Sequence, residues 1–265
     1  MSFDIVFKSA KILRNVFESV QDLVQDLPCS FSTGGFYTQA MDTSHVCLME
    51  IELSVLDDEM FEEYSITQDT IEIGIHVQNM IRALKLARGE DSCRLVWNRE
   101  NSDVLKMDFF ADNDNVTSFE LKLMTVAQEM VGIPDMTSAL TLTFDSELIT
   151  RAIKDMSTLG DTVSIETSIE DDVETGILLL KLTCDGPIGK ATLKLKPHSH
   201  TGSLSQETQE FALRHLASMT KASVLSRQVK IHIPQGMPLC LTFEIQAIES
   251  TMRFFLAPKI KHDEE

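Results

Sequence analysis

Residues 121–134 read LKLMTVAQEMVGIP and lie near the midpoint of the 265-residue chain. The segment begins like a β-strand, stops alternating, stays mostly apolar and ends on Gly132-Ile133-Pro134. A solvent-exposed linker is usually polar, and a core element usually has a regular apolar period. This segment has neither property, so its role has to follow from the sequence on either side of it.

The composition indicates a folded, globular protein. Hydrophobic residues make up 43% of the chain, and the mean hydropathy is -0.02. The length accommodates two domains of about 130 residues each, an ordinary domain size. No apolar run approaches the roughly 20 residues of a membrane span. At the N-terminus, Asp4 and Lys8 interrupt the apolar run that a signal peptide requires, which favours an intracellular protein.

The formal net charge of -18 argues at first against a nucleic-acid partner, because phosphates attract basic surfaces. Acidic runs at 57–63, 170–172 and 262–265 carry much of this charge and are typical of solvated loops and tails. Net charge does not say where the cations lie, however. The five cysteines are scattered, without the spacing of a zinc site, and are predicted to be reduced and buried. No metal site and no cofactor is predicted.

Helical apolar spacing occurs in four segments, 10–24, 76–88, 146–159 and 208–221. Ten β-type runs accompany them, at 94–97, 104–109, 117–123, 140–144, 162–167, 177–183, 190–196, 228–233, 239–245 and 252–256. Arg14 and Arg151, in the first and third helices, are 137 positions apart, and Arg82 and Arg214, in the second and fourth, are 132 apart. This nearly constant offset predicts two copies of one α+β domain, at 1–123 and 137–265, joined by a connector at 124–136.

The polar faces of the four predicted helices carry cations. Each helix offers at least two on one side: Lys11 and Arg14, Arg82 and Lys85, Arg151 and Lys154, Arg214 and Lys221. One such pair is usually just solvated helix surface, but four helices that share the feature suggest a common basic surface. With a Debye length of about 8 Å at physiological salt, acidic groups on a distant rim would scarcely weaken it. An acidic exterior is therefore compatible with a DNA-facing interior.

Four stretches are distinctive: MDTSHVCL at 41–48, LM at 123–124 followed seven residues later by GIP at 132–134, FALR at 211–214 with TKA at 220–222, and FLAPKI at 255–260. In this order and at these separations they resemble the proliferating cell nuclear antigen family, the eukaryotic DNA sliding clamps. The resemblance runs from about residue 3 to residue 261 and so covers the whole chain.

The resemblance implies an α+β DNA-clamp fold, in which three identical subunits form a ring with antiparallel sheets outside and the four short helices lining the hole. It implies a nuclear polymerase processivity factor, or one at a viral replication site, that encircles duplex DNA without reading its sequence. Implied partners are DNA polymerase, a clamp loader and other proteins with Q-x-x-[ILM]-x-x-aromatic-aromatic peptides. The connector would cross the outside of the ring and form one edge of the docking pocket, a role that suits an exposed apolar segment.

The family's functional positions carry over to residues of this chain. The DNA-facing cations implied are Arg14, Arg82, Lys85, Arg151, Lys154, Arg214 and Lys221, to which we add Lys11 from its position on the first helix. The partner-peptide pocket would comprise Met41, Leu48, Ile133, Pro238, Phe255, Ala257 and Pro258, with His45 and Gln128 nearby. The subunit joint would pair edge strands at about 116–123 and 188–196, through Phe119, Leu121, Leu193 and Leu195.

Some positions depart from the family pattern. Phe255 replaces a tyrosine, so the apolar wall of the pocket is kept while a hydroxyl is lost. Asn15 and Gln21 stand where family members often have lysine, which predicts weaker phosphate contact by the first helix. Ile169 stands where the family has a lysine that accepts ubiquitin or a related modifier, so modification is not expected there.

Three other classes of protein remain open at this point. An enzyme is disfavoured, because the sequence has no P-loop, GxSxG, HExxH or dinucleotide fingerprint, and no catalytic residue is predicted. A checkpoint-type clamp subunit would assemble with two different chains. An acidic scaffold would bind proteins only and not DNA.

Overall fold

The computed structural model describes residues 1–111, 115–127, 130–137, 139–170, 177–202, 208–245 and 249–260. The chain divides into two compact units. Unit 1 comprises Met1–Val131 and Glu244–Met252, and unit 2 comprises Gly132–Phe243 and Arg253–Glu265. Among the described residues, no helix has both the length and the apolar character needed to cross a bilayer.

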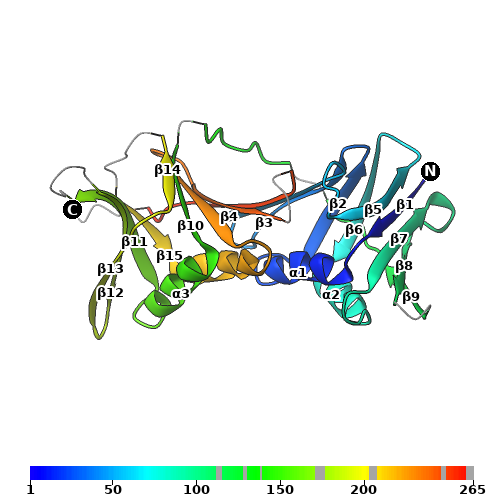
Figure 1. Cartoon of the computed structure of the whole chain (residues 1–265), viewed down its shortest axis with the longest axis horizontal. Helices are drawn as coiled ribbons and strands as arrows, with labels where there is room; N and C mark the ends of the chain where they lie inside the picture. Colours follow the sequence, from blue (N-terminus) through cyan, green and yellow to red (C-terminus); the bar gives the residue numbers. More distant parts are fainter. Residues whose placement is uncertain are drawn as a thin grey trace. The chain divides into compact units, whose positions relative to one another are not determined.

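Unit 1 contains two antiparallel sheets and two α-helices (Figure 1). Its strands are ordered β5-β1-β7-β8-β9 in one sheet and β4-β3-β2-β6 in the other. The elements in chain order are β1 (Ser2–Phe7), α1 (Ala10–Val20), β2 (Asp26–Ser32), β3 (Gly35–Met41), β4 (Cys47–Ser54), β5 (Phe61–Ile66), β6 (Thr70–His76), α2 (Val77–Leu84), β7 (Ser92–Asn98), η1 (Arg99–Asn101), β8 (Val104–Phe110) and β9 (Val116–Lys122).

Unit 2 has the same ingredients. Its strands are ordered β14-β10-β16-β17-β18 in one sheet and β13-β12-β11-β15 in the other. The elements are β10 (Leu140–Asp145), α3 (Ser146–Ser157), β11 (Thr162–Glu170), β12 (Ile177–Gly186), β13 (Gly189–Leu195), β14 (Ser199–Thr201), β15 (Gln209–Ala212), α4 (Leu213–Met219), η2 (Thr220–Val224), β16 (Gln228–Ile233), β17 (Leu239–Glu244) and β18 (Thr251–Leu256).

The two units repeat one topology strand by strand. In each, the first strand lies second in a series of five adjacent strands, is followed by a helix, and is flanked by the strand that comes directly after the second helix. The order β4-β3-β2-β6 in unit 1 corresponds in the same way to β13-β12-β11-β15 in unit 2. The duplicated α+β domain inferred from the helix offsets is therefore confirmed.

The fourth predicted helix is wrong over its first third. Residues Gln209–Ala212 form strand β15, in which Phe211 pairs with Val163 of β11, and α4 begins only at Leu213. The apolar spacing of this segment fits a short strand followed by a helix as well as it fits one long helix. Each of the ten predicted β-type runs contains a strand, whereas β1–β6, β14 and β15 are not among those runs.

Aromatic side chains contribute to the core of each unit. In unit 1, Phe3 of β1 stacks on Phe31 of β2 with ring centroids 4.4 Å apart, so that the two sheets share one aromatic cluster. In unit 2, the Phe243 and Phe254 rings meet edge to face at 6.2 Å. The helices add apolar stripes such as Leu13, Val16 and Phe17, which are buried. Burial of such side chains contributes about 1.5–3 kcal/mol each.

Candidate functional surfaces

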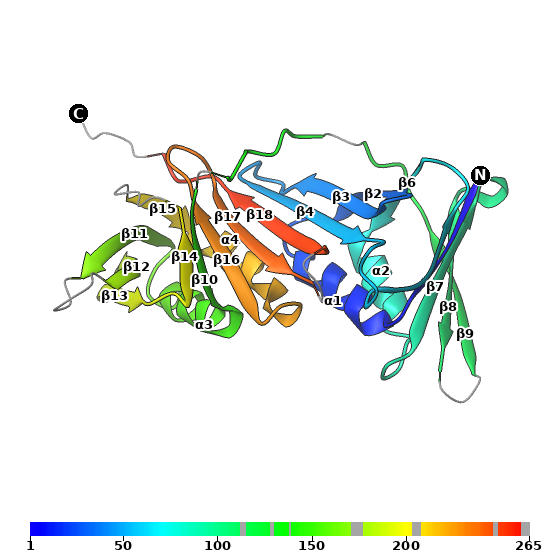
Figure 2. The same ribbon diagram turned by 45° about the horizontal axis from the view of Figure 1, so that its top comes forward.

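The two helices of unit 1 pack side by side and point their polar faces away from the core (Figures 1 and 2). Lys11 of α1, Arg82 of α2 and Lys85 at the end of α2 are exposed. Arg14 is only half-exposed, and its guanidinium Nε is enclosed without a hydrogen-bond acceptor among the described residues. The four predicted cations of this unit therefore differ in their access to a ligand.

Two of these cations lie near carboxylates of unit 1. Lys11 Nζ lies 3.5 Å from Glu90 Oε1, and Lys85 Nζ lies 4.0 Å from Glu18 Oε1. At the same seam, Gln78 Nε2 donates to Gln21 Oε1 at 3.1 Å. Gln21 is thus a bridge between α1 and α2.

In unit 2, α3 packs against α4 and η2. The Thr150 hydroxyl contacts the Thr220 carbonyl at 3.4 Å, so this seam is bridged by uncharged groups. The predicted cations of this unit are all exposed: Arg151 and Lys154 on α3, Arg214 on α4 and Lys221 on η2. Each unit therefore presents cations on a pair of neighbouring helices.

A tight turn joins β3 to β4 and presents His45, which is exposed and has a φ of 54°. Asp42 organises the turn: its Oδ1 accepts from the backbone nitrogens of Val46 at 2.9 Å and Cys47 at 2.7 Å. Burial of Asp42 opposes ionisation, but the hydrogen bonds from Ser44, Cys47 and Val46 outweigh it and lower its pKa to about 2. The turn is therefore held by a carboxylate that stays charged at neutral pH.

The segment quoted at the outset is attached to unit 1 at two points. Met124 forms an isolated antiparallel bridge with Gly74, in which Met124 N donates to Gly74 O at 3.0 Å. Farther along, Gln39 clamps Val131, because its Nε2 donates to Val131 O at 3.0 Å and its Oε1 accepts from Val131 N at 2.7 Å. The sequence analysis did not identify Gln39 as a functional residue. The one sequence feature that could have pointed to it is an amide side chain in the alternating strand just before the 41–48 motif.

A cavity of about 360 Å³ opens in unit 1 where the connector begins. Its walls include residues of β2, β6, β7 and the connector: Pro28, Ile73, Gly74, Trp97, Met124 and Val126. The Trp97 indole N–H donates to Ser102 O at 3.0 Å. The Gly74–Met124 bridge forms part of this wall.

The predicted peptide-binding residues divide between the units. In unit 1, half-buried Met41 pairs across the β3–β4 ladder with buried Leu48, beside the His45 turn. In unit 2 lie Ile133, Pro238, Phe255, Ala257 and Pro258, and Gln128 is outside the described residues. Each unit thus contains part of the predicted set, and the joining of the two parts into one pocket belongs to the proposal below.

The unit 2 part centres on the end of β18. Phe255 is buried, and the Arg253 guanidinium carbon lies 5.9 Å from the centroid of its ring. The chain then leaves the strand through Ala257 and Pro258, which are half-exposed. Lys259 N donates to Glu210 O at 2.7 Å, so the segment after β18 is fixed against β15.

The strands predicted to join subunits are both sheet edges, β9 in unit 1 and β13 in unit 2. Along them Phe119 is 37% exposed and Leu193 is half-buried. Leu121 and Leu195 are buried by their own units, so these two side chains have little surface left for a contact with another copy.

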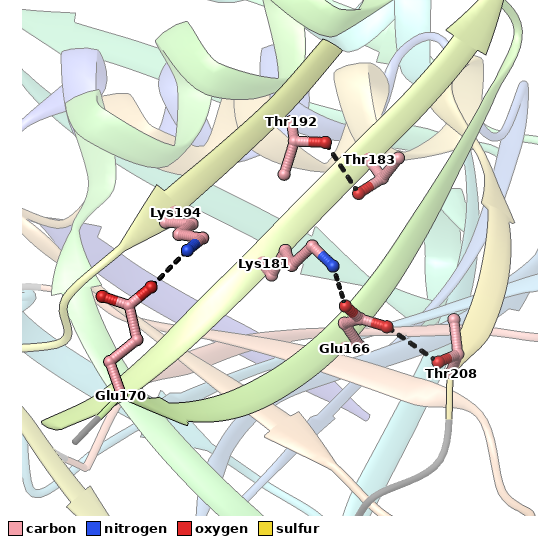
Figure 3. A network of polar contacts seen from close by, with 7 residues as sticks. All are labelled: Glu166, Glu170, Lys181, Thr183, Thr192, Lys194 and Thr208. Atoms are coloured by element: carbon pink, nitrogen blue, oxygen red, sulfur yellow. Dashed lines mark hydrogen bonds and ion pairs between the residues drawn. The ribbon is translucent and has the colours of Figure 1, made fainter. Parts of the chain in front are cut away.

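The outward face of the sheet that contains β13 is polar (Figure 3). Lys194 of β13 pairs with Glu170, and Lys181 of β12 pairs with Glu166. Lys181 and then the Thr208 hydroxyl lower the pKa of Glu166. Along β13 itself, Lys190 and Thr192 are exposed and Leu193 is half-buried.

The described residues contain no group of three or more histidine, cysteine or acidic side chains arranged to hold a metal ion. His198, just before β14, lies with its Nε2 3.2 Å from Asp145 Oδ2. The cysteines are all buried and free of disulfides.

Comparison with known proteins identifies the family. Residues 2–130 match the sequence model for the N-terminal domain of proliferating cell nuclear antigen, and residues 132–260 match the model for its C-terminal domain. A proliferating cell nuclear antigen from Chaetomium thermophilum is 33% identical to this chain, and the alignment covers 97% of this chain and 98% of the Chaetomium protein. The protein of the same name from Caenorhabditis elegans is 30% identical, and the alignment covers 99% of this chain and 98% of the Caenorhabditis protein. The chain therefore belongs to the proliferating cell nuclear antigen family of DNA sliding clamps.

Proposed function

We propose that three copies of this chain close into a ring around duplex DNA and tether DNA polymerase and other replication and repair proteins to it. The observation that carries the proposal is the duplicated unit, in which each copy presents cations on a helix pair although the whole chain has a net charge of -18. The family membership supports it. A checkpoint-type subunit of a mixed ring is not favoured, because both halves match the proliferating cell nuclear antigen models.

The ring would close through its sheet edges. Strands β9 and β13 each leave one side unpaired within their own sheets, and a strand edge is a ready template for another chain. Pairing β9 of one copy with β13 of the next uses two different surfaces, which makes the contact head-to-tail. Such contacts form a closed ring when the rotation between neighbouring copies brings the last copy back to the first. Phe119 would contribute the apolar contact.

The helix cations would face phosphates and not bases. Phosphate contacts position a protein on DNA without reading sequence, and few persistent contacts allow it to slide. Retention would then come from enclosure and not from affinity. The role is that of a non-catalytic tether in the nucleus, with an ATP-driven loader to open the ring.

Partner proteins would dock beside the connector. Gln39 and Gly74 fix the connector at Val131 and Met124, which leaves Met130 and Val131 among the exposed apolar side chains. We propose that this edge, the Met41–Leu48 cluster and the Phe255–Pro258 cluster bind a Q-x-x-[ILM]-x-x-aromatic-aromatic peptide. A few apolar anchors of this kind can dominate a small interface.

The test of encirclement compares circular with linear DNA. The purified chain, loaded by an ATP-driven clamp loader, is expected to remain on a nicked circle and to leave when the circle is cut. Its size in solution should correspond to three identical subunits. Equal retention on circular and linear DNA would refute encirclement, and a lone monomer would support the checkpoint-type alternative.

The docking site can be tested separately from DNA. Ile133→Asp is expected to weaken binding of a Q-x-x-I-x-x-F-F peptide at least tenfold, because a charge would replace an apolar anchor. Leu86→Asp is the matched control, since Leu86 is an exposed apolar residue next to α2 and outside the proposed pocket. Equal peptide affinity in both variants, measured by calorimetry, would place the site elsewhere.

A further inference from the structure

We infer that unit 2 supplies the principal phosphate contacts of this clamp, and that two of the helix cations of unit 1 are partly neutralised by carboxylates of that unit. The inference rests on the proposed encirclement of DNA. It follows from a difference between the two helix pairs that the sequence pattern, with two cations on each helix, does not show.

In unit 1, carboxylates lie within 4.0 Å of two of the helix cations. Glu18 of α1 faces Lys85 at the end of α2 at 4.0 Å, and Glu90 in the following loop faces Lys11 at 3.5 Å. Glu18 has a side-chain exposure of 33%, so its charge is only partly screened by water. A phosphate that approached Lys85 would meet this carboxylate at the same time.

The remaining polar groups of the unit 1 seam are also engaged. The Gln21 and Gln78 amides bond to each other at 3.1 Å. Arg14 is half-exposed, with its Nε enclosed. Of the four predicted cations of this unit, Arg82 alone is exposed and lies more than 4.0 Å from any carboxylate in the described part of the chain.

In unit 2, a contact between uncharged groups joins α3 to η2. Thr150 and Thr220 make that contact through a hydroxyl and a carbonyl. Arg151, Lys154 and Arg214 are exposed, and within the described ranges no carboxylate oxygen comes within 4.0 Å of any of them. At least three cations of unit 2 are therefore available to phosphate.

The difference matters because of how cations contribute to DNA binding. A cation that neutralises a phosphate releases condensed counterions, and each neutralised phosphate adds about 0.9 to the salt dependence of binding. A cation already held by a carboxylate must first exchange partners. An exposed ion pair contributes only about 0–1 kcal/mol, so a phosphate can replace the carboxylate. The lost ion pair then offsets much of the free energy gained from the new phosphate contact. The unit 1 pairs should therefore add little to affinity.

Equilibrium binding of the full chain to a short blunt-ended duplex, which a ring can thread without a loader, tests the inference. Fluorescence anisotropy over a series of salt concentrations gives the slope of log K against log salt. Lys154→Gln is expected to weaken binding several-fold and to reduce the slope by up to about 0.9 for each phosphate that is no longer neutralised. Lys85→Gln, with the same change in charge, is expected to have a clearly smaller effect on both.

A gain-of-function variant makes the test sharper. Glu18→Gln frees Lys85 and is expected to tighten DNA binding and steepen the slope. Glu62→Gln is the matched control, because it removes the same charge from an exposed position on β5, in a sheet and not on a helix. Circular dichroism and solution size confirm that all variants keep the fold and the ring.

Two results would overturn the inference while leaving the clamp intact: equal weakening of DNA binding by Lys85→Gln and Lys154→Gln, or equal affinity of Glu18→Gln and Glu62→Gln. If the unaltered chain showed neither salt-dependent binding to the duplex nor retention on circular DNA, the proposed function itself would fail and the inference with it. The two failures are thus distinguishable.

Discussion

At the scale of single residues, His232 shows how partial burial in a sheet sets the ionisation of a side chain. His232 of β16 lies between two threonines on neighbouring strands: its Nδ1 is 2.9 Å from Thr141 Oγ1 and its Nε2 is 3.1 Å from Thr242 Oγ1. Burial, followed by the charges of Lys230 and Arg253, lowers the pKa of His232 to about 4. The imidazole is therefore neutral in the folded protein at physiological pH.

This lowered pKa predicts a loss of stability in acid. The unfolded chain, with a histidine pKa of about 6.5, binds more protons than the folded protein between pH 6.5 and 4, so stability falls as the pH is lowered through that window. The upper limit of the loss is about 3 kcal/mol, and we expect roughly 1–2 kcal/mol because the side chain is only half-buried. His232→Gln should flatten the dependence of the unfolding free energy on pH between 6.5 and 4, as measured by urea titration.

The control for that measurement is His200→Gln, because His200 is exposed on β14. Its unfolding free energy should follow that of the unaltered chain through the acid window. A His232→Gln variant with the same pH dependence as the unaltered chain would show that His232 is not the group responsible.

At the scale of elements, the connector is positioned by contacts that its own sequence does not encode. An ideal Cβ placed on Gly74 would lie 2.2 Å from Met124 O, so the strand and the connector approach each other only because residue 74 is glycine. Gln39 fixes the other end at Val131. An apolar, aperiodic segment can be held along the surface in this way without a period of its own.

Gly74→Ala is expected to displace the start of the connector. The added methyl group cannot coexist with the Met124 carbonyl, so the bridge should open, and trypsin should cleave after Lys122 several-fold faster than in the unaltered chain. Gly132→Ala provides the control, because nothing lies within 4 Å of a Cβ at that position. Similar cleavage rates for the two variants would show that the Gly74–Met124 bridge does not hold the start of the connector.

At the scale of the whole molecule, the fold leaves two different strands, β9 and β13, at the edges of their sheets. The Phe119 side chain on β9 is the exposed apolar group of the first edge. Edge strands that present unpaired backbone groups are usually protected or paired in native proteins. The ring proposed above would pair them between copies.

Phe119→Asp is therefore expected to shift the protein from trimer to monomer, by at least a tenfold rise in dissociation constant, since it places a charge in the joint. Sedimentation velocity at several concentrations measures the change. Leu56→Asp alters an exposed leucine in the turn after β4, away from both edges, and should leave the trimer unaffected. Dissociation of both variants, or of neither, would contradict the proposed joint.

The sequence by itself determined the duplicated α+β domain, the family and the cations of the helices. Periodicity and spacing are local properties, and 41–48 and 255–260 are stretches that can be matched without a structure. It did not determine where the fourth helix begins, because Phe211 suits a strand and a helix equally, and a backbone partner in β11 decides between them.

Only the tertiary structure decided which predicted residues are accessible and which are neutralised. Leu121 and Leu195 are buried by their own units, and Lys85 lies near Glu18, which is 67 positions away in the chain. Gln39 and Gly74 became functional candidates through contacts with a segment far from them in sequence. Burial and ion pairing depend on what folding brings within a few ångströms, and no single stretch of sequence carries that information.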